Sequence, residues 1–153
     1  MRFVFRLEPV LRDRDRTEKA RLREWSIVNQ ILGNLVLEKK RLENALGEAQ
    51  QDFNALSATP RISVALLQEA DHYIKSLFQK IEWKRLEILR AEKFVQKKHQ
   101  EWQAARMKKQ VIEKIRERRF EDFKLEQKDR EAKSLDDLYI MAEARRMRES
   151  EEE

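Results

Sequence analysis

Ser57-Ala58-Thr59-Pro60-Arg61 interrupts an apolar repeat that runs along the chain on both sides of it. Before this stretch, positions that are apolar with one exception recur at alternating spacings of three and four: Trp25, Val28, Leu32, Leu35, Lys39, Leu42, Leu46, Ala49, Phe53 and Leu56. After it the same rhythm restarts, with two lysines among its members: Leu67, Ala70, Ile74, Leu77, Ile81, Lys84, Ile88, Ala91, Val95, Lys98, Trp102 and Ala105. Such a spacing keeps one side of a helix, here called the seam, facing one partner helix.

The interruption predicts how the two seams meet. Pro60 cannot sit in a helix interior, and two helices joined by a few residues can pair only by running antiparallel. We therefore predict an all-α fold, a long antiparallel two-helix coiled-coil hairpin with unequal helices. The expected bounds are a first helix over 9–56, a turn over 57–62 and a second helix over 63–146, capped by Thr59 or Ser63. The whole chain, 1–153, would be one coiled-coil unit ending in a frayed acidic tail over 149–153.

The composition excludes several classes of protein. Charged and hydrophobic residues each make up 41% of the chain, and there are only two glycines and two prolines, which is typical of long helices with a narrow apolar seam. The absence of cysteine excludes disulfides and thiolate metal sites, and the two histidines lie too far apart on one helix to share a metal. No phosphate-binding loop or activated nucleophile occurs, so we predict neither an enzyme nor a cofactor. Apolar runs are too short for direct membrane insertion.

The unequal helices predict an overhang. Folding about residue 60 would set Pro9 beside residue 110, so the segment from about Val111 to Arg146 would have no partner within the chain. It still carries apolar residues, among them Phe120 and Phe123. We expect it to fray, kink or dock on another protein.

The same folding would bring two basic segments, 1–23 and 106–119, to the open end of the hairpin. Each alone is most simply a solvated charged face, but their coincidence favours an acidic partner. Nucleic acid fits less well, because acidic residues dilute the basic runs and no aromatic platform is interleaved with them. The candidate binding residues are Arg12, Arg14, Arg16, Arg106, Lys108, Lys109, Lys114, Arg116, Arg118 and Arg119.

A second candidate surface lies midway along the hairpin. Leu37, Trp83 and Leu86 are apolar but off the seam, and should point away from the partner helix at one level. Scattered surface hydrophobes are the simpler interpretation, whereas their clustering favours a protein-binding patch.

Parts of the sequence resemble a known family. The opening Phe3-Val4-Phe5-Arg6-Leu7-Glu8-Pro9-Val10-Leu11, with Glu126-Gln127-Lys128, Leu135-Asp136-Asp137-Leu138 and Ala144-Arg145-Arg146, resembles the flagellar type III export protein FliJ family. The resemblance implies a cytoplasmic rod, peripheral to the inner face of the cell membrane at the flagellar base. Such a rod binds the centre of the hexameric export ATPase and promotes its assembly. It also contacts the cytoplasmic region of the membrane export gate protein and escorts export chaperones. Tyr73 and Leu77 align with the family's gate-contacting positions.

Two alternatives remain open on the sequence. The equivalent stalk protein of a virulence-type secretion system would share the fold and the ATPase partner. A generic coiled-coil scaffold could instead dimerise through the overhang.

Overall fold

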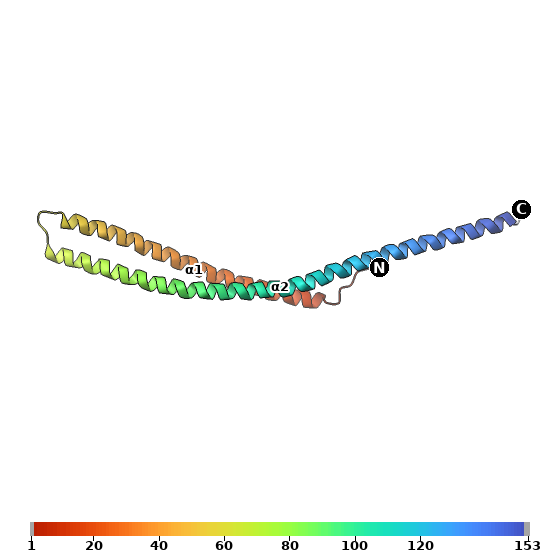
Figure 1. The fold of residues 1–153 in the computed structure, drawn as a ribbon, viewed down its shortest axis with the longest axis horizontal. Helices are drawn as coiled ribbons and strands as arrows, with labels where there is room; N and C mark the ends of the chain where they lie inside the picture. Colours follow the sequence, from red (N-terminus) through yellow and green to blue (C-terminus); the bar gives the residue numbers. More distant parts are fainter. Residues whose placement is uncertain (1, 152–153) are drawn as a thin grey trace. The chain divides into compact units, whose positions relative to one another are not determined.

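Two long helices make up nearly all of the protein. The computed structural model describes residues 2–151, in which α1 spans Glu8–Ser57 and α2 spans Val64–Glu151 (Figure 1). No strand occurs in that range. The predicted all-α fold with unequal helices is confirmed.

Packing contacts divide the chain into two compact units. The hairpin unit is Thr17–Ala105, and the terminal unit combines residues 2–16 with residues 106–151. The division falls where the apolar seam of α1 gives way to charged residues: Arg14, Glu18 and Arg21 continue the 3-4 spacing in place of apolar side chains.

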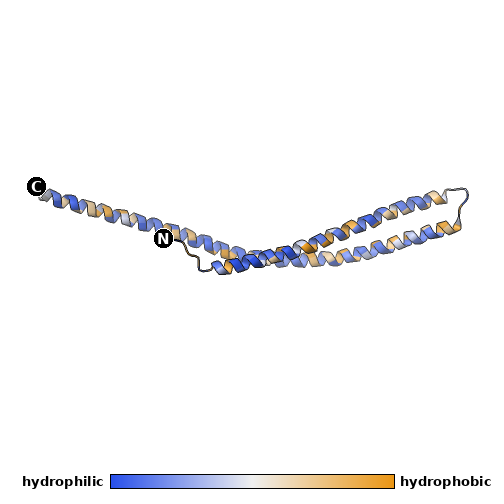
Figure 2. Ribbon diagram, turned by 180° about the vertical axis from the view of Figure 1, so that it is seen from behind, coloured by the Kyte–Doolittle hydropathy of each residue, from blue (hydrophilic) through white to orange (hydrophobic). Residues whose placement is uncertain are grey.

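In the hairpin unit α1 and α2 lie side by side and antiparallel, joined by residues 58–63 (Figure 1). Every predicted seam position is buried or half-buried, which confirms the seam. Leu77 is the most enclosed, with 3% of its surface exposed, and Ala49 and Ala105 are also buried. Figure 2 shows apolar residues recurring along both helices between hydrophilic ones. The core is therefore a narrow line of contacts between two helices.

Ion pairs between the helices fix their register. Lys84 Nζ lies 2.8 Å from Glu38 Oε2, and Lys98 Nζ lies 3.3 Å from Glu24 Oε2. Glu24 precedes Glu38 on α1 by as many residues as Lys98 follows Lys84 on α2. The register is therefore uniform between these two levels, as an antiparallel coiled coil requires.

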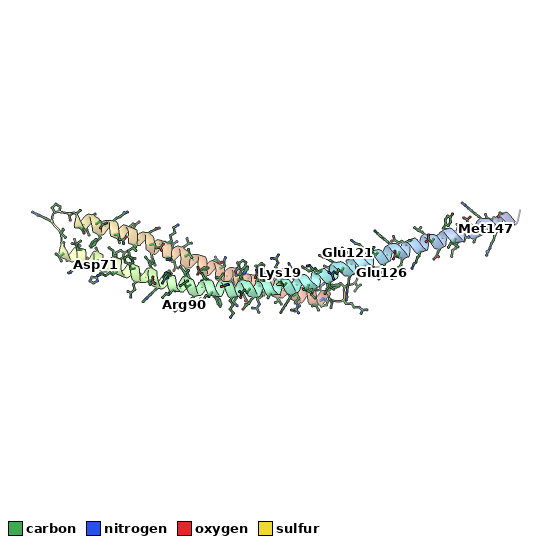
Figure 3. The ribbon with its side chains drawn as sticks, in the orientation of Figure 1. Lys19, Asp71, Arg90, Glu121, Glu126 and Met147 are labelled. Carbon is green, nitrogen blue, oxygen red and sulfur yellow. The ribbon has the colours of Figure 1, made fainter. Side chains whose placement is uncertain are left out.

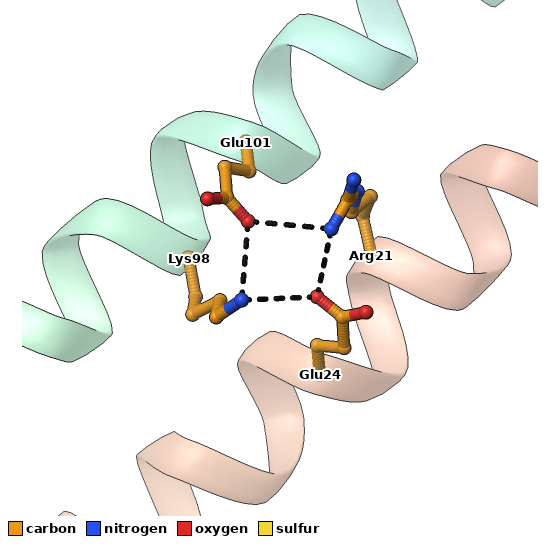
Figure 4. A network of polar contacts seen from close by, with 4 residues as sticks. All are labelled: Arg21, Glu24, Lys98 and Glu101. Atoms are coloured by element: carbon orange, nitrogen blue, oxygen red, sulfur yellow. Dashed lines mark hydrogen bonds and ion pairs between the residues drawn. The ribbon is translucent and has the colours of Figure 1, made fainter.

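The pair at Glu24 belongs to a ring of four charged residues, here called the polar ring (Figure 4). Arg21 Nη1 lies 3.1 Å from Glu24 Oε2 and 3.5 Å from Glu101 Oε2, and Lys98 Nζ lies 3.3 Å from Glu101 Oε2. The hydrogen bonds from Arg21 and then Lys98 lower the pKa of Glu24, while those to Glu24 and Glu101 raise the pKa of Lys98. Glu24 and Lys98 are therefore each held in the charged form.

Aromatic packing adjoins the polar ring. The rings of Trp25 and Trp102 stack with centroids 5.4 Å apart and planes 8° apart, and His99 packs against both. Trp102 Nε1 donates a hydrogen bond to Glu18 Oε1 at 2.9 Å. The two large rings thus bury apolar surface while the indole nitrogen of Trp102 keeps a polar partner.

The turn differs in detail from the expectation. Ser57 Oγ donates to the carbonyl of Phe53, and Thr59 Oγ1 donates to that of Leu56, so both hydroxyls serve the end of α1. The residue before α2 is Ser63, whose carbonyl accepts the N–H of Leu67. Of the two predicted caps, Ser63 therefore has the N-cap position, and Thr59 bonds the Leu56 carbonyl in the last turn of α1.

In the terminal unit residues 2–16 pack along α2. Lys109 Nζ lies 2.8 Å from Asp15 Oδ1, and Arg116 Nε lies 3.6 Å from Glu8 Oε2. The start of α1 thus faces a point further along α2 than residue 110, the predicted neighbour of Pro9. The turn occupies residues 58–63, so its centre lies just beyond residue 60. Each residue of α1 therefore faces a residue slightly further along α2 than a turn centred on residue 60 would give.

The prediction that residues from Val111 onward have no partner is wrong for the first part of that segment. The Phe3 ring packs against Phe120 and Phe123, at centroid distances of 5.2 and 5.6 Å. Residues 2–7 precede α1 without being helical. An extended chain advances about 3.3 Å per residue against 1.5 Å in a helix, so these few residues reach well along α2.

The remainder of α2 is exposed along its length. From Lys128 to Ser150 every side chain is exposed, including Leu135 and Tyr139 at 67% and 71%. Figure 3 shows side chains standing out around a single helix between Glu126 and Met147. The helix continues past Arg146 to Glu151, so the first residues of the expected acidic tail are helical, and residues 152–153 lie outside the described range.

Within residues 2–151 no helical stretch has the length and apolar character that crossing a bilayer needs.

Candidate partner-binding surfaces

The terminal unit contains all ten basic residues that the sequence singled out. They come from the first three turns of α1 and from α2 between Arg106 and Arg119. The structure therefore brings together the two segments that are far apart in the sequence. Arg14 and Lys109 are half-buried, and the other eight are exposed.

Several of these cations already contact groups within the unit. Lys109 pairs with Asp15 and lies 3.7 Å from Glu113, and Arg116 pairs with Glu8. The guanidinium of Arg119 lies 5.9 Å from the centre of the Phe5 ring. These three side chains therefore contribute to the packing of the unit itself.

The cations that remain available form what we call the basic surface. Its members are exposed and make no ion pair within residues 2–151: Arg12, Arg16, Lys108, Lys114 and Arg118. Sequence reasoning could not separate these from the engaged cations, because the separation depends on which acidic residues face them across the unit.

Midway along the hairpin unit lies a hollow of about 590 Å³, here called the Trp83 groove. Trp83, which lines this groove, is 64% exposed. Residues of both helices line it: Glu38, Arg41, Leu42 and Ala45 from α1, and Lys80, Trp83, Lys84 and Glu87 from α2. The groove thus combines one large exposed aromatic ring with charged side chains of both signs.

Three charged residues that line the groove, Glu38, Lys84 and Glu87, are joined by ion pairs. Lys84 Nζ lies 2.8 Å from Glu38 Oε2 and 3.0 Å from Glu87 Oε2. The hydrogen bond from Lys84 lowers the pKa of Glu38, and the bonds to Glu38 and Glu87 raise the pKa of Lys84. Glu38 and Lys84 therefore both stay charged around neutral pH.

The structure does not gather the predicted patch of Leu37, Trp83 and Leu86. Leu37 and Leu86 are exposed, at 55% and 44%, but neither lines the groove. Both occupy the heptad position opposite the seam, one on each helix, so they point to opposite outer edges of the hairpin. Trp83 instead belongs with Arg41, Ala45 and Lys80, which flank the seam on one side.

The positions that flank the seam carry the signal that was missed. On the flank that includes Trp83, exposed apolar side chains recur at Ile27, Ile31, Tyr73 and Phe94, with exposures between 48% and 59%. A search for residues next to the seam, rather than opposite to it, would have found this stripe.

Within residues 2–151 no cluster of three or more histidine, aspartate or glutamate side chains is arranged to hold a metal ion.

A protein-family model described as "Flagellar FliJ protein" matches residues 3–148, a range that takes in both helices and the turn between them. The chain belongs to the FliJ family. It is therefore a coiled-coil protein associated with flagellar protein export, in a family known for a structural stalk role and not known as an enzyme. No curated protein and no solved structure matches the chain.

Membership of the FliJ family gives the two aligned gate positions a structural test. Tyr73 is 52% exposed, whereas Leu77 is buried in the seam. Leu77 therefore packs between the helices and cannot present an exposed aliphatic surface. Tyr73 lies on the flank that also carries Trp83, so an exposed contact in this region would use Tyr73 and the Trp83 groove.

Proposed function

We propose that this protein is the stalk of the hexameric flagellar export ATPase. Its basic surface binds acidic loops at the centre of the ring and promotes assembly of the hexamer. The observation that carries this is the convergence of ten basic side chains from two distant segments in one unit. Membership of the FliJ family supports the identity of the partner.

The basic surface acts mainly on the rate and orientation of binding. At physiological salt the Debye length is about 8 Å, so charges on an exposed surface are screened beyond that distance. Such charges steer association more than they stabilise the final complex. Specific contacts with the ring come from the exposed apolar side chains of α2 between Leu125 and Met147.

The Trp83 groove takes the second role, contact with the cytoplasmic region of the export gate. A tryptophan at the edge of a hollow is the kind of residue that dominates binding energy at interfaces. Tyr73 extends this contact along the same flank. Escort of export chaperones belongs to the same proposal, and we assign no separate surface to it.

Matched charge reversals test the ATPase contact. Reversing Lys108, Lys114 and Arg118 to glutamate should slow association with the export ATPase severalfold and flatten its salt dependence. Helicity should be unchanged, because these side chains make no ion pair within the described residues.

The control reverses three exposed cations of the hairpin unit, Arg90, Lys93 and Lys97, and so changes net charge by the same amount. The two variants should differ strongly in association rate. Equal slowing in both would show that only net charge matters, and the basic surface would lose its proposed role.

A further inference from the structure

The segment before α1 is packed against α2 although it has no regular structure. Residues 2–7, here called the N-terminal clasp, lie in the terminal unit. Phe5 is buried at 7% exposure and Phe3 is half-buried, whereas Val4 between them is 76% exposed. The two phenylalanines therefore point toward α2 while the intervening side chain points to solvent, as in an extended strand.

Four side-chain contacts hold the clasp and the residue that follows it. Phe3 meets Phe120 edge-on with planes at 68° and meets Phe123 at 55°. Arg119 lies over the ring of Phe5, and Glu8, just after the clasp, pairs with Arg116. Aromatic pairs and cation–π contacts of these geometries are each favourable by roughly 0.5–1.5 kcal/mol at partly exposed sites.

The backbone of the clasp contributes almost nothing to this attachment. Two of its carbonyls accept hydrogen bonds from the start of α1, that of Phe5 from the Glu8 N–H and that of Leu7 from the Leu11 N–H. No backbone hydrogen bond joins residues 2–7 to α2 in the described range. The α2 surface therefore recognises the side chains of an extended segment, and another segment with the same side chains would satisfy it equally.

The surface under the clasp also has room that the clasp does not fill. A hollow of about 290 Å³ lies among Phe3, Arg116, Glu117 and Phe120. Lys124 Nζ lies 4.5 Å from the centre of the Phe120 ring, so cations flank the aromatic side chains along this stretch. The surface thus offers aromatic faces, two guanidinium groups and unfilled volume together.

We propose that residues 116–124 of α2 form a binding site for an extended peptide segment with two aromatic residues spaced by two positions and a carboxylate three positions further on. The chain's own Phe3, Phe5 and Glu8 have this pattern and occupy the site. A partner that carries the same pattern displaces the clasp and takes its place. The clasp is attached to the same chain, and its high effective concentration makes it a competitor that such a partner must overcome.

The test removes the aromatic contacts of the clasp from the full-length protein and then adds the clasp sequence as a separate peptide. Replacing Phe3 and Phe5 together by alanine should speed amide exchange over residues 116–123 by roughly tenfold, because the aromatic cover is lost. Adding a peptide with the sequence of residues 2–9 should restore the protection. The same peptide with alanine at both phenylalanine positions should not.

Two controls make the result specific. Val4→Ala removes an exposed apolar side chain from the same segment and should leave exchange over 116–123 unchanged. Exchange of the seam from Leu67 to Ala105 should stay the same in every variant, which shows that the protein remains folded. Unchanged exchange in the double variant, restoration by the alanine peptide or failure of the wild-type peptide to restore protection would each overturn the binding site.

Discussion

At the residue scale, the two seam lysines show how a polar residue is accommodated between helices. Lys84 and Lys98 each have 20% of the side chain exposed, so the apolar stem packs in the seam while the ammonium group reaches carboxylates at the edge. Each ammonium contacts one carboxylate on α1 and one on its own helix. The lysines were visible in the sequence as exceptions to the repeat, but their partners were not.

These contacts predict how stability depends on pH. The pKa of Glu24 and that of Glu38 are lowered, so their contribution is present above the ordinary carboxyl value of 4.5 and is lost as pH falls through the lower folded value. The pKa values of Lys84 and Lys98 are raised, so their contribution is present below 10.5 and is lost as pH rises through the higher folded value. The melting temperature should therefore be flat near neutrality and fall at both ends.

A single substitution tests the loss of stability at low pH. Lys98→Met keeps an apolar stem in the seam but removes one hydrogen-bond donor to Glu24, so the melting temperature should fall less steeply than in the wild type as pH drops below the ordinary carboxyl value of 4.5. Lys97→Met, at an exposed neighbouring position, should keep the wild-type slope. Equal slopes in all three proteins would mean that the Lys98–Glu24 pair does not contribute.

Trp83 gives a prediction about binding. Trp83→Ser should change the melting temperature little, because the side chain is mostly exposed, but should weaken binding to the export gate fragment by about 2 kcal/mol or more if it is a hot spot. Leu37→Ser, which removes an exposed apolar side chain at the opposite edge, is the control and should bind normally. Titration calorimetry measures both. A large loss of stability with normal binding would show that Trp83 is a packing residue.

At the element scale, α2 changes character along its length. Its first part packs on α1, residues 109–123 pack on the start of the chain, and residues 128–150 are exposed throughout. The charged residues that dominate α2 have good helix propensity, so helical structure persists even where no partner covers it. Tertiary packing, and not secondary structure, distinguishes these stretches.

Leu77 and Tyr73 lie one turn apart on α2 but differ in burial, because Leu77 is in the seam and Tyr73 is half exposed. Leu77→Ala should destabilise the hairpin by about 2–3 kcal/mol, because a buried side chain is removed from the seam. Tyr73→Ala should cost less than about 1 kcal/mol, because the ring is half exposed. Urea unfolding of the two variants gives the comparison. Similar losses would show that the seam does not distinguish these positions.

The parts of the fold that the sequence predicts are those with a regular repeat. Each seam position from Trp25 to Ala105 could be named because a 3-4 spacing repeats many times and tolerates the single lysines. The register could not be read as well, since it depends on how many residues the turn around Pro60 takes up. The contact of Phe3 with Phe120 was not foreseen, because six non-helical residues have no period and their partner lies more than a hundred positions away.

At the scale of the whole molecule, the two units differ in how they are held together. The hairpin unit has a continuous apolar seam, whereas the terminal unit depends on a few buried residues, such as Phe5 and Leu11, together with ion pairs. Distinct compact units can open separately, each with its own free energy. Two-state unfolding is therefore not expected for the chain.

The tryptophans allow a direct check. All three, Trp25, Trp83 and Trp102, lie in the hairpin unit, so their fluorescence reports that unit alone, while circular dichroism reports helix in both. On heating, helix should begin to be lost before tryptophan fluorescence changes. Coincident transitions would indicate that the two units unfold together.

The ion pairs of Lys84 and Lys98 with α1 also disfavour pairing of the helices in a wrong register. If α1 slid by one heptad along α2, Lys98 would meet Thr17 or Ile31 instead of Glu24, and Lys84 would meet Ile31 or Ala45 instead of Glu38. Both ammonium groups would then sit at the edge of the seam without a facing carboxylate on α1, although the apolar positions would still match. A repeating seam by itself allows such slips, and the ion pairs penalise them. The ion pairs therefore select the register of the hairpin, because only the observed alignment gives both Lys84 and Lys98 a carboxylate partner on α1.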